Sequence, residues 1–116
     1  MKVINLAEKS SRFDTRWDPK VVASCNGNDI IVVKFTGEFP FHAHSDTDDF
    51  FLAIEGEVLL DVEDRTHVLR AGELFVVPHG VRHRPRAVHE AKVLLIEPEG
   101  TPNPGDPATA SARARI

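Results

Sequence analysis

Short apolar runs separated by turn-forming residues dominate this sequence and limit what it can fold into. Runs rich in β-branched and aromatic residues stand at positions 30–35, 50–54, 58–62, 67–69, 74–77 and 93–96. Glycine, proline, asparagine or aspartate occurs in the segments between them. Because each run is too short for a typical helix and ends near a turn signal, we predict six strands. Many short strands with tight turns predict an all-β fold: a sandwich, a jelly roll or a small barrel.

The N-terminal segment departs from this pattern. A weak helical signal covers residues 4–10, and little other helix is expected. We expect residues 1–25 to form an edge segment, anchored by Trp17, Val21 and Val22, that pairs with this subunit or with a partner. A small all-β domain leaves a sheet edge and an apolar outer face exposed, so we also expect a homodimer.

The C-terminal segment has no core pattern. From Pro98 to Pro107, six of ten residues are proline or glycine, and the end of the chain reads ATASARARI. We therefore expect a single domain over residues 1–106, followed by a disordered or extended tail over residues 107–116. Removing that tail should leave the melting temperature and the metal content unchanged.

Length, charge and cysteine content exclude several classes of protein. At 116 residues the chain is long enough for one domain with one core. Its formal net charge of -4 predicts no basic surface for nucleic acid. Cys25 is the only cysteine, which excludes an internal disulfide and a cysteine zinc site. The N-terminal run VINLA is too short for a secretory signal, and no later run is long enough for a membrane span. We expect a cytoplasmic protein without nucleic-acid or membrane partners.

Three histidines and one aspartate have the spacing of a metal site. His42 and His44 are two residues apart, so on a strand both side chains point to the same face. Asp49 follows a polar stretch short enough to be a turn, which would let the next strand run back beside the first. His83 comes from a distant strand and supplies a third imidazole. These four residues are the candidate metal ligands.

Two longer patterns resemble the two sequence motifs of the cupin family. The first is carried by Gly37, His42, His44, Asp49 and Gly56, and the second by Gly72, Pro78, Gly80 and His83. From about Trp17 to Asp106, the chain is similar to small single-domain cupins, which are often labelled mannose-6-phosphate isomerase-like. The resemblance implies a double-stranded β-helix, or jelly-roll barrel, with one metal ion near its centre held by the three histidines.

The acidic residue of the first motif departs from the family pattern. Asp49 stands where the family usually has glutamate, and its side chain is one methylene shorter, about 1.5 Å less in reach. Either the strand lies closer to the ion, or Asp49 binds through water, or it does not bind. Asp48 is the competing carboxylate, but on an extended chain it points to the opposite face. Phe51 and Ala53 share the face of Asp49, where they line a cavity or pack in the core. Ala87 replaces the asparagine that sometimes ends the second motif.

The ligand set limits the metal and the chemistry. Imidazole and carboxylate ligands suit nickel, zinc, iron(II), manganese or cobalt, and suit calcium or copper(I) poorly. Four protein ligands leave two positions of an octahedron free for water, dioxygen or a small oxygenated metabolite. Such an open site fits a dioxygenase, isomerase or lyase, and it also fits a module that binds or senses a metabolite without turnover. A structural ion in a dimer is the third alternative, and the open positions favour the first two over it.

The remaining histidines and the arginines near His83 are assigned to the surface. His79 lies within the Pro-x-Gly turn, and His67 and His89 stand among charged residues. If His83 points into the barrel, neighbours at odd sequence distances point outward. These neighbours are Arg82, Arg84 and Arg86. The sequence therefore predicts no clear cation that would hold the phosphate of a phosphosugar beside the metal.

Overall fold

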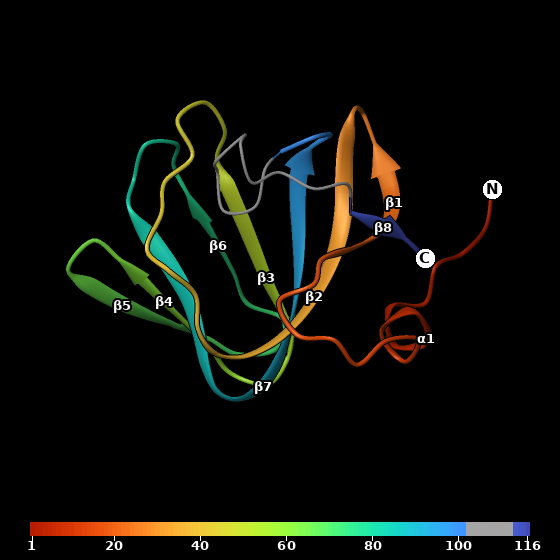
Figure 1. The fold of residues 1–116 in the computed structure, drawn as a ribbon, viewed down its shortest axis with the longest axis horizontal. Coiled ribbons are helices and arrows are strands. Elements are labelled where there is room, and N and C mark those ends of the chain that lie inside the picture. Colours follow the sequence, from red (N-terminus) through yellow and green to blue (C-terminus); the bar gives the residue numbers. More distant parts are fainter. Residues whose placement is uncertain (102–112) are drawn as a thin grey trace.

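The structure, a computed structural model, describes residues 1–101 and 113–116, and it is dominated by strands. In chain order the elements are α1 (Leu6–Ser10), β1 (Lys20–Cys25), β2 (Asn28–Glu38), β3 (Asp49–Glu55), β4 (Val58–Val62), β5 (Arg65–Leu69), β6 (Leu74–Val77), β7 (His83–Pro98) and β8 (Ala114–Arg115) (Figure 1). The predicted all-β class with little helix is confirmed.

All six strands predicted from the sequence are present. β4 and β6 have the predicted bounds, 58–62 and 74–77. The other strands are longer than predicted, and β7 differs most, because it begins at residue 83 rather than at residue 93. The added part of β7 begins at His83, the last residue of the second motif, so one of the predicted ligands lies on a part of the strand that the hydrophobic pattern did not reveal.

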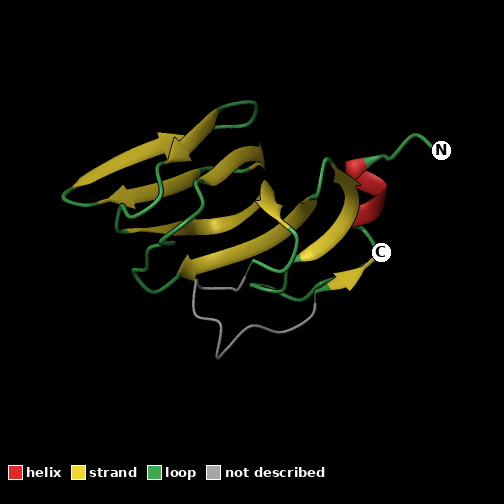
Figure 2. Cartoon of the chain, turned by 90° about the horizontal axis from the view of Figure 1, so that it is seen from above, coloured by secondary structure: helices red, strands yellow, loops and turns green. Residues whose placement is uncertain are grey.

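Two long strands, β2 and β7, form the centre of the fold and pair antiparallel along most of their length. The hydrogen-bonded order is β5-β4-β7-β2-β1-β8, and β3 pairs with both β7 and β6. The first part of β7 pairs with β4 and its last part with β3, so β7 belongs to both halves of the sheet. Register shifts in β2 and β3 bend these strands. The strands therefore curve around a common interior, as a jelly roll does (Figure 2).

Apolar side chains from the inward-facing positions fill the interior. They include Ile31, Val33, Phe35, Phe51, Ala53, Val58, Leu60, Val77 and Val93. The turn between β3 and β4 approaches this core closely at Gly56, which has a φ of 81°. A Cβ at this position would lie 2.8 Å from the carbonyl oxygen of Glu90, so only glycine lets the turn pack this close to β7.

The N-terminal segment adds a strand to its own chain. β1 pairs antiparallel with β2, and Val21 and Val22 on β1 are buried. Of the two predicted alternatives, pairing within the same subunit is the one observed. Trp17 stacks on Phe35 with ring centroids 4.5 Å apart, and it holds a φ of 58° while doing so. Backbone and side-chain contacts together therefore fix this residue against the core.

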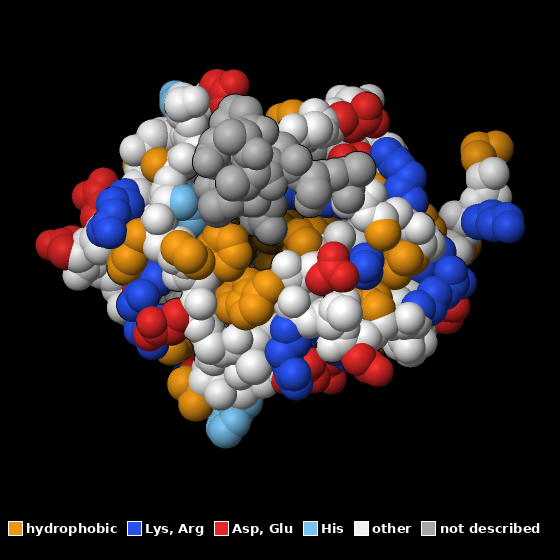
Figure 3. All heavy atoms as spheres, in the orientation of Figure 1, with side chains coloured by type: hydrophobic (Ala, Val, Ile, Leu, Met, Phe, Trp, Pro, Cys, Tyr) orange, Lys and Arg blue, Asp and Glu red, His pale blue; other side chains and the backbone are white. Residues whose placement is uncertain are grey.

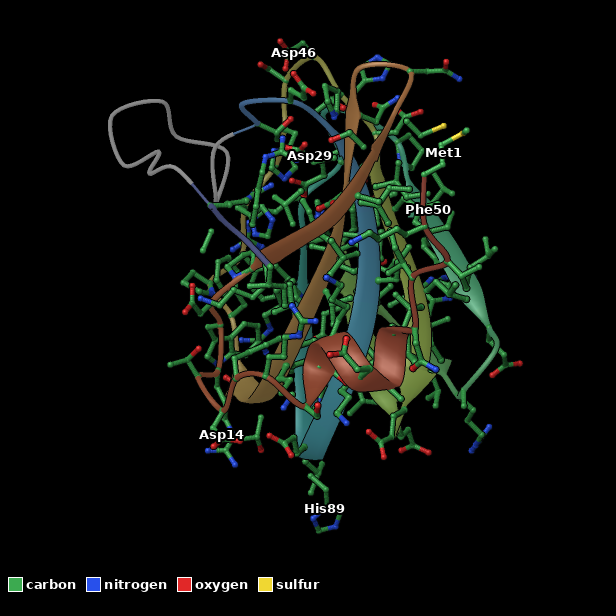
Figure 4. All side chains as sticks on the ribbon, turned by 90° about the vertical axis from the view of Figure 1, so that its right-hand side faces the viewer. Met1, Asp14, Asp29, Asp46, Phe50 and His89 are labelled. Carbon is green, nitrogen blue, oxygen red and sulfur yellow. The ribbon has the colours of Figure 1, made fainter. Side chains whose placement is uncertain are left out.

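The predicted helix over residues 4–10 is α1. The Asn5 side chain caps it by accepting a hydrogen bond from the Glu8 backbone N–H at 2.9 Å. α1 contacts β2 and lies across the outer face of the sheet (Figure 4). No helix in residues 1–101 and 113–116 is both long and apolar enough to cross a membrane.

The described C-terminal residues are docked onto the sheet. β8 pairs in parallel with β1, and the Ile116 backbone N–H donates to the Val21 carbonyl oxygen at 3.0 Å. Arg113 forms an ion pair with Glu97 on β7. This end of the chain is thus bound both through its backbone and through a charged side chain.

The predicted disordered or extended tail over residues 107–116 is described only at its end. Residues 107–112 lie outside the described residues, whereas residues 113–116 are extended and, beyond the prediction, are paired with β1. The hydrophobic pattern did not reveal this docking because ion pairs and backbone hydrogen bonds hold the segment, not an apolar face. Removal of the segment is accordingly expected to lower stability.

Candidate metal centre

Backbone hydrogen bonds join the two predicted motifs to each other. His42 and His83 form an isolated antiparallel bridge, in which each N–H donates to the other carbonyl oxygen at 2.9 Å. The N–H of Gly80 donates to the carbonyl oxygen of His44 at 2.7 Å. Gly80 has a φ of 81°, which suits glycine, so the Pro-x-Gly turn folds back onto the first motif. The main chain therefore sets the spacing of the histidines.

The four predicted ligands converge on one point. One ligand atom from each of His42, His44, Asp49 and His83 lies within 4.8 Å of every other. Asp49 Oδ2 is 2.7 Å from Nε2 of His83, 3.3 Å from Nε2 of His44 and 3.8 Å from Nε2 of His42. The shorter aspartate side chain therefore does reach the three imidazoles.

The histidine rings are oriented by backbone carbonyl groups. His42 Nδ1 lies 2.9 Å from the Pro40 carbonyl oxygen, and His83 Nδ1 lies 2.8 Å from that of Val81. A carbonyl oxygen only accepts, so each Nδ1 carries a hydrogen, and Nε2 is the ring atom that faces Asp49 and could bind a metal ion. Acceptor atoms this close repel each other unless a proton or a cation lies between them. The donor set therefore fits a divalent metal ion.

Burial and hydrogen bonding set the charges of the cluster. Asp49 is 4% exposed, and burial by itself raises its pKa. Hydrogen bonds with the three imidazoles outweigh burial and hold the pKa of Asp49 well below its usual range. The hydrogen bond to Asp49 also raises the pKa of His44, against the effect of burial. Asp49 is thus an anion at neutral pH, surrounded by three imidazoles.

A pocket opens onto three of the four residues. His42, His44 and Asp49 line it, and the rest of its wall is mainly apolar. The apolar wall includes Trp17, Phe35, Phe39, Phe51, Val93 and Leu95. On one face of the molecule, hydrophobic side chains gather around a central hollow (Figure 3). A small molecule in the pocket would therefore meet aromatic rings on one side and the histidine–aspartate cluster on another.

Glu97 also lines the pocket, and the sequence analysis missed it. This residue is 5% exposed and forms an ion pair with Arg113. Burial raises the pKa of Glu97, while the Arg113 guanidinium acts in the opposite direction. A signal for Glu97 was present, because it follows His83 on β7 by an even number of residues and therefore shares its inward face.

The competing carboxylate, Asp48, points away from the cluster. Its Oδ1 lies 2.9 Å from the His79 backbone N–H and 3.0 Å from the His79 ring Nδ1. Both side chains are more than half exposed, which confirms the opposite facing of Asp48 and the surface position of His79. His89 is exposed at one end of the molecule (Figure 4). His67 is only partly exposed, because it packs on Phe75 with ring centroids 4.5 Å apart.

The arginines beside His83 point outward, as strand alternation predicted. His83 is 1% exposed, whereas Arg84 and Arg86 lie on the outer face and both donate to Asp61 Oδ2, at 2.9 and 2.7 Å. Arg82 is exposed. None of the three is among the described residues that line the pocket. They therefore stabilise the outer surface rather than the candidate site.

Comparison with known families agrees with the fold. The family model for the cupin domain (Cupin_2) matches residues 30–97, more than half of the chain. The chain therefore belongs to the cupin family, as its two motifs implied. The narrower resemblance to mannose-6-phosphate isomerase-like cupins stays a prediction.

Individual relatives extend this finding. The chain is 35% identical to the uncharacterised protein YdbB of Bacillus subtilis (strain 168) over 77 residues, which are 66% of this chain and 68% of YdbB. It is 30% identical over 96 residues to a 3-hydroxyanthranilate 3,4-dioxygenase of Xanthomonas campestris pv. campestris (strain B100). That match covers 76% of this chain and 54% of the enzyme, so the chain spans about half the length of this relative.

One solved structure is similar to this chain over nearly the whole length of the solved protein. It is a cupin-2 domain containing protein from Shewanella frigidimarina NCIMB 400, with a TM-score of 0.82 and 42% sequence identity. The similarity covers 84% of this chain and 95% of that one. The jelly-roll architecture is therefore shared with a protein of closely related sequence.

Proposed function

We propose that His42, His44, Asp49 and His83 bind one divalent transition metal, and that the protein is a metal-dependent enzyme of the dioxygenase class. Its substrate would be a small ring compound with adjacent oxygen or nitrogen groups. The observation that carries this proposal is the convergence of three Nε2 atoms on one buried carboxylate oxygen at the wall of a pocket.

The position of the ligands supports an open site rather than a structural one. Three of the four candidate ligands line the pocket, so a metal ion there would face the space that a small molecule enters. When bound, the ion would supply a Lewis acid, or in the case of iron(II) a redox centre, with free positions for a chelating ligand. A structural ion would instead be enclosed by its protein ligands.

The surrounding residues of the chain would support this chemistry. The Pro40 and Val81 carbonyl groups hold the rings of His42 and His83 with Nε2 turned to Asp49. The apolar wall excludes water from the ligand. The sequence contains no tyrosine, so protons must move through a histidine, a carboxylate or water.

The choice of a dioxygenase among metal-dependent enzymes rests on the 3-hydroxyanthranilate 3,4-dioxygenase relative. Because the chain spans about half of that enzyme, the substrate of the relative is not carried over, only its type: a ring with neighbouring oxygen or nitrogen groups. Iron(II) is the corresponding metal among the five that suit this ligand set, because it supports oxygen chemistry.

Metal analysis and oxygen uptake test the proposal. Protein purified without a histidine tag should contain iron or take it up under anaerobic conditions, at about one ion per chain. The iron(II) form should then consume oxygen with at least one member of a panel of catechols and aminophenols, and His44→Ala should not. Saturable binding of panel compounds by the iron(II), manganese, nickel and zinc forms without turnover would instead identify a binding or sensing module.

A further inference from the structure

One charged residue interrupts the apolar wall of the pocket. Val93, Leu95 and Glu97 alternate along β7, and all three side chains line the pocket. Glu97 is 5% exposed, close to Val93 at 1% and more buried than Leu95, which is only partly buried. Because Asp49 is a proposed metal ligand, Glu97 is the remaining carboxylate among the described lining residues.

Glu97 belongs to an acidic pair that the C-terminal end of the chain neutralises. Asp29 on β2 and Glu97 on β7 are direct cross-strand partners, and like charges in such positions repel each other. Arg113 forms an ion pair with Glu97, and Arg115 forms one with Asp29 at 3.2 Å. Arg113 and Arg115, which alternate along one short segment, therefore each neutralise one of the two acidic residues.

The two ion pairs have different surroundings. The side chains of Arg113 and Glu97 are 11% and 6% exposed, whereas that of Arg115 is 61% exposed. Asp29 is not among the described residues that line the pocket, but Glu97 is. Burying an ion pair costs desolvation energy that an apolar pair would not, so stability alone does not explain a charge at this position. A carboxylate bound by one arginine keeps further capacity to accept hydrogen bonds.

We propose that Glu97 is a ligand-binding residue of the pocket, whose carboxylate accepts a hydrogen bond from a hydroxyl or amino group of a molecule chelated at the metal. Arg113 is the residue that positions this carboxylate. The inference rests on the proposed metal site and narrows its substrate class. The ligand is a small ring compound that carries a third polar group, a hydrogen-bond donor, besides the two groups that bind the ion.

Two probe ligands that differ by one hydroxyl group test this inference. Catechol offers only a chelating pair, whereas pyrogallol adds a third hydroxyl beside that pair. The dissociation constants of both are measured without oxygen on the cobalt(II) form, whose visible absorption reports changes at the metal. The dissociation constant of catechol divided by that of pyrogallol measures the preference for pyrogallol. This ratio is then compared between the wild type and Glu97→Gln. This comparison cancels the intrinsic difference between the two compounds in metal affinity.

The expected result is a loss of preference for pyrogallol. A hydrogen bond to a charged acceptor is worth about tenfold more in binding than one to a neutral acceptor, so the ratio should fall about tenfold in Glu97→Gln. Cobalt content should stay at the wild-type value, and catechol affinity should change much less than pyrogallol affinity. Arg113→Ala should lower the ratio in the same direction, and it provides a second measurement should Glu97→Gln fold poorly.

Arg115→Ala is the matched control, because it removes the neighbouring ion pair of the same segment without touching Glu97. Its ratio should equal that of the wild type. If Glu97→Gln keeps the wild-type ratio, or if Arg115→Ala lowers the ratio as much as Arg113→Ala, the inference is overturned while catechol binding leaves the proposed function standing. If the cobalt(II) form of the wild type binds neither compound, the proposed function fails and this inference fails with it.

Discussion

Gly80 donates its backbone N–H to the carbonyl oxygen of His44 at 2.7 Å, and this bond links the turn of the second motif to the strand-like segment of the first. Three residues beyond Gly80, His83 exchanges two backbone hydrogen bonds with His42. Gly80 therefore acts on the candidate site through the main chain and not as a ligand. Its hydrogen bond links the segment that carries His44 to the turn that leads into His83.

The first prediction concerns the backbone of Gly80. Gly80→Ala should cost about 1–2 kcal/mol of stability, because alanine at a φ of 81° is strained although no atom crowds its Cβ. Metal affinity should also fall, because the strain is relieved by moving the turn that holds His44. Gly27→Ala is the control: Gly27 has a φ of 76°, is equally uncrowded and lies in the β1–β2 turn. Thermal melts and metal titrations should show a lower melting temperature in both variants but weaker metal binding only in Gly80→Ala.

The second prediction concerns the candidate metal ligands. Replacing any one of His42, His44 and His83 by alanine should remove most of the bound metal while leaving the protein folded. Since a ligand at a hundredfold excess over its dissociation constant adds about 2.7 kcal/mol, metal should raise the melting temperature of the wild type but not of these variants. Full metal occupancy and equal melting in all three variants would eliminate the site.

Asp49 allows a sharper form of the same test. If Asp49 binds the ion directly, Asp49→Ala should cost as much affinity as the loss of a histidine, and Asp49→Asn should cost less. If it acts through water or by orienting His83, Asp49→Ala should keep the ion with affinity lower by about 10- to 100-fold. Asp48→Ala is the control, because Asp48 faces His79 and solvent, and its metal content should equal that of the wild type.

Strand alternation predicted more of this structure than hydrophobicity did. It placed His83 inside and the neighbouring arginines outside, and the structure confirms this arrangement. Hydrophobic patterning found only residues 93–96 of β7, because arginine and histidine occupy much of its first half. That half becomes a strand through pairing with β2 and β4, which are distant in sequence. Local sequence does not carry such information.

The C-terminal segment shows a second limit of sequence reasoning. Arg113 and Arg115 alternate as residues on a strand do, but with only alanines and Ile116 beside them they gave no strand signal. Their partners, Glu97 and Asp29, become adjacent only when β2 pairs with β7. A charge pattern on one strand therefore becomes interpretable only after the register of two other strands is known.

The third prediction concerns the dependence of stability on pH. Hydrogen bonds from Arg86, Thr66 and Arg84, the first being the largest, outweigh burial and hold the pKa of Asp61 well below its usual value of 3.8. A carboxyl group with a lowered pKa adds stability above its ordinary value, and this contribution is lost as pH falls through the lowered pKa. Asp61→Asn should therefore be less stable than the wild type by about 2 kcal/mol at pH 7.

Chemical denaturation at several pH values checks this prediction. The difference between Asp61→Asn and the wild type should be constant above pH 5 and should shrink steadily below pH 4. Asp48→Asn is the control, because Asp48 is exposed and its ion pair with His79 contributes little. A difference for Asp61→Asn that stays the same at low pH would contradict the assigned role of the Arg86 and Arg84 contacts.

The fourth prediction is a homodimer that buries the outer face of the sheet. A row of apolar residues runs across β6, β3, β7 and β2, namely Val76, Phe50, Ile96 and Ile30, and a second, shorter row of Leu74 and Leu52 runs beside it on β6 and β3. Leu74 and Val76 are 54% and 44% exposed, and contiguous apolar surface of this kind is typical of interfaces. Light scattering at micromolar concentration should give the mass of a dimer.

Charge placed within these rows should separate the subunits. Val76→Glu should give a monomer that keeps its fold, because this side chain is already partly exposed. Val88→Glu is the matched control, since Val88 is 74% exposed and lies outside both rows, and it should stay a dimer. A wild-type protein that scatters light as a monomer would contradict the prediction.

The last prediction concerns the docked C-terminal end. Deleting residues 113–116 removes β8 and the arginine partner of Glu97, and it leaves a buried carboxylate without its counter-charge. Removing one member of a buried ion pair costs about 3–5 kcal/mol, so the deletion should lower the melting temperature by well over a few degrees. Adding Glu97→Gln to the deletion should recover part of this loss, because the neutral amide is cheaper to bury than the unpaired carboxylate. If the deletion melts like the wild type, the docking of this segment contributes nothing to stability. If the deletion is destabilised but Glu97→Gln gives no recovery, β8 stabilises the sheet through its backbone pairing alone.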